Sequence, residues 1–198
     1  MAKVITIGRE YGAGGHSIGV RVAEELGIPF YDKDIMRETA KASGYDIEMV
    51  HDEDEDETTG NMILKTILSS VHFNDPQDAI HEVQKAVIQK FAMEGPCVIL
   101  GRNADLAVKE AGIDAVNVFI HADEIHRAAR ISEMTGVKDP TELKKMIQKR
   151  DKSRHNYYTH YASKHWGDSR NYTLTLDSGV LGYDFCVKMI VEAVKAAE

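Results

Sequence analysis

Cysteine is scarce in this sequence, whose 198 residues include two, Cys97 and Cys186. Both lie in apolar stretches, and neither belongs to a CxxC spacing of the kind that binds metals. Buried cysteines behave as small hydrophobic residues, and proteins of a reducing cytoplasm rarely form disulfides. We therefore expect a fold that no disulfide and no cysteine-bound metal stabilises.

An excess of positive charge is also missing. The chain has 24 lysine and arginine residues against 32 aspartate and glutamate residues, which gives a net charge of −8. Such a chain offers no broad basic face to a nucleic-acid backbone, so we expect no nucleic-acid partner. A few converging arginines can still form a positive pocket for a small anion inside an acidic protein.

Long hydrophobic runs are absent as well. No apolar stretch approaches the roughly 20 residues that span a bilayer, and the segment before the first glycine is too short for a signal peptide. The hydrophobic content of 43% and charged content of 28% are ordinary for a globular protein. We expect a soluble cytoplasmic protein with no membrane partner; the sequence carries no signal for its oligomeric state.

Short β-branched runs alternate with longer helical patterns, which predicts an α/β three-layer fold with a parallel sheet. Several of the runs are almost wholly apolar, as strands buried on both faces are. The five expected strands are 4–8, 28–32, 97–101, 115–121 and 172–177. The expected helices are 17–26, 76–94, 103–111, 123–134 and 181–197.

Two segments interrupt this alternation, and neither has an alternating pattern of its own. We therefore interpret them as insertions, 33–94 and 126–170, in one domain that spans 1–198. The first insertion contains six consecutive acidic residues at 52–57. Like charges repel one another, so this run is expected to form a solvated loop; a cation site or a partner site is the alternative.

The strongest local signal is a strand that runs directly into glycines and then into a helix, ITIGREYGAGGHS at 5–17. Glycines let consecutive backbone N–H groups turn toward an anion, and the helix N-terminus adds partial positive charge. Ser17 has the position and chemistry to ligate Mg²⁺ on the phosphates. The expected cradle consists of Gly12, Ala13, Gly14, Gly15, His16 and Ser17. A glycine-rich turn without a ligand is the alternative.

The loop lacks the lysine of the GxxxxGK[ST] phosphate-binding motif, because Gly15 or His16 stands at its place. Protonated His16 could supply the missing positive charge. Arg9, or an arginine of the second insertion, is the alternative. Without such a substitute, the protein would bind a nucleotide and turn it over poorly.

Taken together, these features resemble the cytidylate kinase-like family of P-loop proteins over nearly the whole chain. Residues 12–14 are similar to the Gly-Ala-Gly of the cytidylate kinase loop, and 27–34 to the strand and acidic turn that begin the monophosphate-binding region. Residues 101–103 are similar to the Gly-Arg-Asp that reads the monophosphate nucleotide, with asparagine replacing aspartate. Residues 149–154 resemble the lid sequence Arg-Asp-x-x-Arg, and the KHWGD at 164–168 is typical of the kinase-like branch.

The resemblance implies a helical monophosphate-binding insertion at 33–94, a lid at 126–170, and ATP-dependent phosphoryl transfer with Mg²⁺. The acceptor it implies is CMP or dCMP, and another small phosphorylated or hydroxylated molecule is the alternative. Such transfer depends on positive charge around the phosphoryl group, which the planar fork of arginine suits. The expected catalytic residues are Arg9, His16, Arg150 and Arg154. The expected acceptor-binding residues are Asp32, Arg102, Asn103 and Asp151.

A second function stays open at this stage. The loop without a lysine favours a nucleotide-binding protein that has weak or no kinase activity and a regulatory role. The retained arginines favour a kinase.

Overall fold

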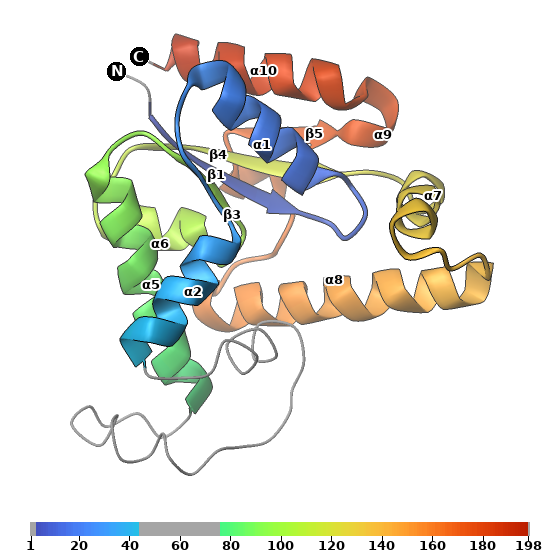
Figure 1. The fold of residues 1–198 in the computed structure, drawn as a ribbon, viewed down its shortest axis with the longest axis horizontal. Helices are drawn as coiled ribbons and strands as arrows, with labels where there is room; N and C mark the ends of the chain where they lie inside the picture. Colours follow the sequence, from blue (N-terminus) through green and yellow to red (C-terminus); the bar gives the residue numbers. More distant parts are fainter. Residues whose placement is uncertain (1–2, 44–75, 198) are drawn as a thin grey trace.

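The computed structural model describes residues 3–43 and 76–197, which form a parallel sheet between two layers of helices (Figure 1). The sheet has five strands in the order β2-β3-β1-β4-β5, and every neighbouring pair is parallel. The strands are β1 (Val4–Arg9), β2 (Phe30–Tyr31), β3 (Val98–Leu100), β4 (Ala115–His121) and β5 (Leu174–Asp177). The predicted fold class is confirmed, whereas the acidic run 52–57 lies outside the described residues.

Helices bury both faces of the sheet because side chains alternate along each strand. Ile5 and Ile7 of β1 pack under α1 (Gly15–Leu26) and α10 (Tyr183–Ala196), which lie together on one face (Figure 1). Val4 and Ile99 face the other layer, where they meet α5 (Pro76–Glu94) and α6 (Ala104–Glu110). This two-sided burial explains why the strands read as continuous apolar runs.

Several boundaries differ from the predicted ones for local reasons. β2 is shorter because Pro29 has no N–H and the N–H of Ile28 bonds to the end of α1, at Ala23 O. β5 starts late because the chain first forms a 3₁₀ turn, η2 (Ser169–Asn171). The last predicted helix, 181–197, starts later, as α10 (Tyr183–Ala196), because Gly182 separates it from a short preceding helix, α9 (Ser178–Leu181).

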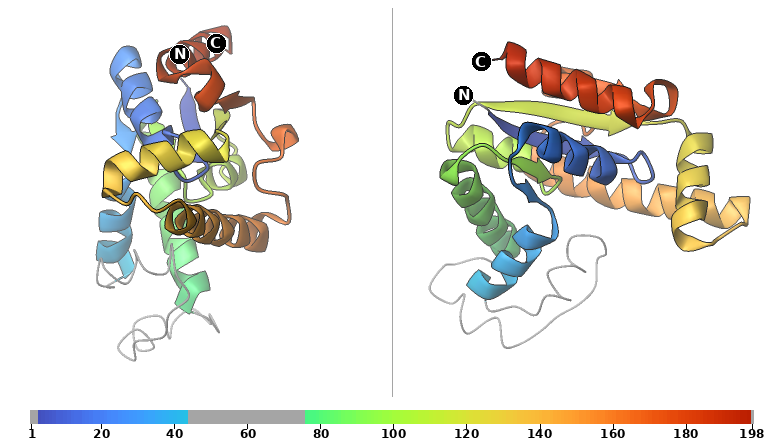
Figure 2. Two further views of the ribbon diagram at one scale, coloured as in Figure 1. Left: turned by 90° about the vertical axis from the view of Figure 1, so that its right-hand side faces the viewer. Right: turned by 45° about the horizontal axis from the view of Figure 1, so that its top comes forward.

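The described parts of the two insertions are helical. The first contributes α2 (Lys33–Ser43) and α5; the second contributes α7 (Glu124–Thr135) and α8 (Pro140–Ala162). Aspartates cap both helices of the second pair, since Asp123 accepts from the N–H of His126 and Asp139 from the N–H of Glu142. Figure 2 shows α7 at the same end of the sheet as the loop between β1 and α1. The interpretation of the two segments as monophosphate-binding insertion and lid stays a prediction.

Two sequence expectations concern cysteines and membranes. Cys97 and Cys186 are both buried and neither forms a disulfide, as expected. Among the helices that the structure describes, none is long and apolar enough to cross a membrane.

Candidate functional site

The loop between β1 and α1 presents backbone N–H groups at the carboxyl end of the sheet. Gly12 and Gly14 adopt left-handed φ values of 84° and 79°, which glycine tolerates readily. The first intrahelical bond runs from Ile18 N to Gly14 O at 3.0 Å, so the N–H groups of residues 14–17 have no acceptor inside the helix. Gly14 has no side chain that could cap them. They are therefore open to an anion.

Ala13 of the predicted cradle, and Tyr11 just before it, have N–H groups that are already bonded within the protein. The N–H of Ala13 donates to Glu10 O at 3.3 Å, and its carbonyl accepts a hydrogen bond from Ser178 Oγ at 2.7 Å. The N–H of Tyr11 donates to Asp151 Oδ1 at 2.8 Å. The N–H groups of Tyr11 and Ala13 are thus used in internal hydrogen bonds, whereas those of residues 14–17 have no acceptor inside the helix.

A charged network ties this loop to α7 and α8. Arg127 bonds to Asp151, and its Nε lies 3.4 Å from Glu10 Oε2. Glu10 Oε2 also accepts from Ala122 N at 3.2 Å. Burial raises the pKa of Glu10, against the opposite effect of Arg127. Asp151, which the sequence analysis places among the acceptor-binding residues, is thus paired with Arg127 and with the backbone of Tyr11.

Arg9, at the end of β1, folds back across the start of α1. A Cβ placed on Gly15 would lie 2.7 Å from the Cβ of Arg9, and one on Gly101 would lie 1.8 Å from its Nη1. The side chain therefore runs from the loop to the carboxyl end of β3. Burial, followed by the neighbouring charge of Arg102, lowers the pKa of Arg9 to about 10, which keeps it charged at neutral pH.

Three consecutive left-handed residues follow β3: Gly101, Arg102 and Asn103, at φ 70°, 61° and 51°. Positive φ is uncommon outside glycine, and strained backbone of this kind concentrates at functional sites. Arg102 Nη2 lies 2.9 Å from Met36 Sδ, and burial lowers the pKa of Arg102. The buried Nδ2 of Asn103 has no hydrogen-bond partner among the described residues.

The predicted lid arginines reach the loop from α8. Arg154 Nη1 donates to Arg9 O at 3.2 Å. The guanidinium carbons of Arg150 and Arg154 lie 6.0 and 5.7 Å from the ring centroid of Tyr11, within cation–π range. Burial and the nearby charge of Arg9 lower the pKa of Arg154 to about 9. α8 thus contacts both the backbone and an aromatic ring of the loop.

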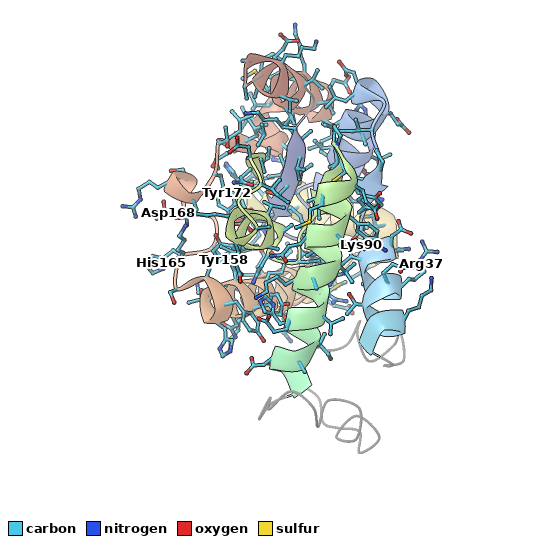
Figure 3. The ribbon with its side chains drawn as sticks, turned by 90° about the vertical axis from the view of Figure 1, so that its left-hand side faces the viewer. Arg37, Lys90, Tyr158, His165, Asp168 and Tyr172 are labelled. Carbon is cyan, nitrogen blue, oxygen red and sulfur yellow. The ribbon has the colours of Figure 1, made fainter. Side chains whose placement is uncertain are left out.

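Three of the arginines, Arg9, Arg102 and Arg154, line one small cavity. It measures about 50 Å³, and Arg9, Arg102, Asn103 and Arg154 contribute to its lining together with a group of aromatic residues. The aromatic residues are Tyr157, Tyr158, Trp166 and Tyr172. Figure 3 shows Tyr158 and Tyr172 together on one side of α5, away from Arg37 and Lys90. The cavity therefore combines positive charge with flat apolar surfaces.

A wider hollow of about 300 Å³ opens beside the loop at Gly12, against α7 and the start of α10. Arg130 and Tyr183 line it, with the guanidinium carbon 5.8 Å from the ring centroid. The Tyr183 ring packs so closely on Gly14 that a Cβ there would lie 2.2 Å away. Arg130 Nη2 also donates to Ser17 Oγ at 3.2 Å.

His16 lies at the surface, with 59% of its side chain exposed. Its Nδ1 is 3.0 Å from Asp32 Oδ2. Burial lowers the pKa of Arg9 and of Arg102, and the nearby charge of Asp32 partly offsets this effect on both. The structure therefore places His16 outside the arginine cluster and Asp32 at its edge.

Polar and aromatic side chains of α5 and α8 contact one another next to the cavity, which Tyr157 of α8 also lines. His81 Nδ1 lies 2.8 Å from the Tyr157 hydroxyl, which donates to Gln84 Oε1 at 3.0 Å. The His81 ring stacks on Tyr161 with 3.5 Å between centroids. Burial lowers the pKa of His81 from 6.5 to about 4.

This shift predicts acid sensitivity. Between pH 6.5 and about 4 the unfolded chain binds a proton at His81 that the native protein excludes, so the free energy of unfolding falls as the pH decreases through this interval. His81→Phe keeps a ring on Tyr161 and removes the titrating group. The free energy of unfolding should therefore depend less steeply on pH in this variant. Urea unfolding of both proteins from pH 4 to 7 measures it; equal slopes would contradict the prediction.

Some residues of the site escaped the sequence-based prediction. Tyr183 belongs to the last helix, and nothing near it in the sequence marks contact with Gly14. Glu10 and Tyr11 stand within the loop motif, but only the folded structure connects them to Arg127 and α8. Gly101 carried a usable signal, because it follows a buried strand and precedes an arginine.

Comparison with known proteins gives a family and a fold. The sequence model described as the cytidylate kinase-like family matches residues 4–180. No functionally curated protein matches the sequence. Among solved structures, an uncharacterized protein from Eubacterium ventriosum ATCC 27560 is 26% identical, with 98% of this chain and 99% of that chain covered and a TM-score of 0.73.

Two kinases share the fold at lower identity. A gluconokinase from Sinorhizobium meliloti 1021 is 18% identical, with coverage of 99% and 93% and a TM-score of 0.59. A shikimate kinase from Bacteroides thetaiotaomicron is 14% identical, with coverage of 98% and 97% and a TM-score of 0.55. At these identities the likeness concerns the fold, which is that of P-loop kinases.

Proposed function

The chain belongs to the cytidylate kinase-like family, and we propose that it transfers the γ-phosphoryl group of ATP to a small phosphorylated acceptor. A nucleoside monophosphate, CMP or dCMP by the family resemblance, is the first candidate for that acceptor. The observation that carries the proposal is the meeting of Arg9, Arg102 and Arg154 at one cavity next to the glycine loop.

The loop supports the nucleotide half of this proposal. The open N–H groups of residues 14–17 suit the triphosphate, since backbone donors and the helix dipole both favour an anion there. The hollow of about 300 Å³ beside Gly12 suits the nucleoside. Arg130 and Tyr183 offer a guanidinium plane and a ring for stacking on a base.

Magnesium fits the oxygen donors at this place. Mg²⁺ prefers carboxylate, hydroxyl and phosphate oxygens and keeps several waters. The Asp32 carboxylate beside the arginine cluster and the Ser17 hydroxyl at the start of α1 are the residues that would hold it. The ion would supply positive charge that offsets the negative charge developing on the phosphate oxygens during transfer.

The cavity supports the acceptor half. Arg9, Arg102 and Arg154 bring three positive charges into a partly buried space, whereas Asp32 brings one negative charge to its edge. An anion of high charge, such as a phosphate group, would balance them. The unpartnered Nδ2 of Asn103 offers a further donor, and Trp166 and Tyr157 offer flat surfaces to a base.

The decisive experiment measures ADP release in a coupled assay with Mg·ATP and a panel of acceptors. The panel contains the nucleoside and deoxynucleoside monophosphates, with gluconate and shikimate as acceptors that carry no phosphate. We expect CMP or dCMP to raise the rate at least about tenfold over ATP alone, while gluconate and shikimate leave it unchanged. A rate that no acceptor raises would contradict phosphoryl transfer.

The missing lysine favours a second function, a regulatory protein that binds nucleotide without transferring phosphate. The same samples distinguish it. If ATP raises the Tm while no acceptor raises ADP release, the binding function stands and the kinase does not.

A further inference from the structure

We propose that Arg9 replaces the lysine that the loop lacks, and that it does so from the opposite end of the loop. Its stem occupies the space above Gly15, and its guanidinium group reaches the β- and γ-phosphates of a nucleotide bound on the cradle. This inference rests on the proposed function and deepens it by naming the residue that binds the transferred group.

The first line of support is steric. Gly15 is the first residue of α1, and of the two positions where the motif's lysine could stand it is the one that directly follows the Gly-Ala-Gly at 12–14. A Cβ there would lie 2.7 Å from the Cβ and 2.9 Å from the Cγ of Arg9, closer than real side-chain atoms approach. A lysine side chain at position 15 would collide with Arg9 on its observed path. The position of the arginine therefore requires that residue 15 has no side chain.

The second line of support is where the guanidinium group ends. A Cβ on Gly101 would lie 1.8 Å from Arg9 Nη1 and 3.0 Å from its Cζ. The charged head therefore lies directly against the left-handed turn after β3, among Arg102 and Asp32. Arg154 fixes the other end of the residue through its bond to Arg9 O. The head is held where the loop, β3 and the lid helix meet.

The other candidates for the missing charge lie elsewhere. His16 is exposed and bonded to Asp32. Arg127 is paired with two carboxylates, those of Glu10 and Asp151. Arg150 lies over the Tyr11 ring. Arg9, by contrast, has its stem against the first helical residue, Gly15, and its guanidinium group against Gly101 at the end of β3.

The role follows from the chemistry of phosphoryl transfer. The acceptor oxygen bonds to the γ-phosphorus, and the bond between that phosphorus and the bridging oxygen of ADP breaks. Arg9 donates hydrogen bonds to the phosphate oxygens throughout and gives up no proton. Its planar fork would hold two oxygens where a lysine holds one.

The placement can be tested without any nucleotide. Alanine at the start of a helix normally stabilises relative to glycine, so Gly15→Ala in an Arg9→Ala background should raise the Tm by about 2–3 °C. In the wild-type background the same change meets the arginine stem and should lower the Tm. If Gly15→Ala has the same effect in both backgrounds, the proposed path of Arg9 is wrong.

The role is tested by turnover. Arg9→Met keeps the stem and removes the charge, and should reduce acceptor-stimulated ADP release about 100-fold. Gly15→Lys alone should be inactive, whereas Arg9→Ala/Gly15→Lys should recover at least about tenfold over Arg9→Ala. Arg21→Ala is the matched control, since Arg21 lies on α1 and pairs with the exposed Asp184; it should retain wild-type turnover.

Two results overturn the inference in different ways. If the wild-type protein turns over ATP and Arg9→Met stays within about threefold of it, Arg9 does not replace the lysine and the proposed function survives. If the wild-type protein neither binds Mg·ATP nor releases ADP, the proposed function fails and the role of Arg9 fails with it. In that case the Tm comparison still decides the path of the side chain.

Discussion

Replacing Gly101 by alanine should reduce acceptor-stimulated ADP release about 100-fold and leave the protein folded. The added Cβ would overlap Arg9 Nη1, at 1.8 Å, so the guanidinium group must leave its place against β3. The left-handed φ of 70° adds about 1–2 kcal/mol of backbone strain. The variant should therefore lose most of its turnover while its free energy of unfolding falls only modestly.

Gly112→Ala separates the two effects. Gly112 has nearly the same left-handed φ, 69°, but a Cβ there meets no atom within 4 Å. The two variants should show a similar cost from backbone strain, measured as the free energy of unfolding in urea. Gly112→Ala should keep turnover within about twofold of wild type. Equal turnover in both variants would mean that the contact between Arg9 and Gly101 has no part in the reaction.

Replacing Asp151 by alanine should destabilise the protein by about 3 kcal/mol. Arg127 and Asp151 are largely buried, with 11% and 17% of their side chains exposed, and Asp151 also accepts the N–H of Tyr11. Removing the carboxylate leaves a buried guanidinium group and a loop amide without a main partner. For a chain of this size the Tm should fall by about 6–12 °C, which calorimetry measures.

Two further variants control for the destabilisation. After Asp151→Ala, Arg127 keeps its longer contact with Glu10, so Arg127→Met should lower the Tm less in that background than in the wild type, as expected for a coupled pair. Asp184→Ala removes an aspartate whose side chain is 91% exposed and should change the Tm by less than about 2 °C. If Asp151→Ala has as small an effect as Asp184→Ala, the buried network does not hold the loop.

The sheet could be predicted from the sequence because its central strands are buried on both faces and read as apolar runs. β4 was predicted with its observed bounds, Ala115–His121. The prediction failed at the ends of β2 and β5, where Pro29 and the turn η2 decide the pairing. Such ends depend on single hydrogen bonds that an alternation pattern does not record.

The candidate site could be predicted in part for a similar reason. Glycines between a strand and a helix indicate a cradle locally, so its position follows from neighbouring residues. The path of Arg9 depends on Gly15 and on Gly101, and Gly101 lies within reach of the Arg9 head only because β3 pairs with β1. The packing of Tyr183 on Gly14 likewise depends on the docking of α10 beside α1. Contacts between distant segments decide these positions.

The central claim is that the N–H groups at the start of α1 bind the phosphates of a nucleotide. An ¹⁵N–¹H spectrum recorded during titration with Mg²⁺ and a non-hydrolysable ATP analogue observes these groups directly. We expect the largest shifts at Gly14, Gly15, His16 and Ser17, with Gly112 and Gly136 unmoved. If the analogue saturates the protein and the amide signals of residues 14–17 do not shift, these groups do not bind the phosphates.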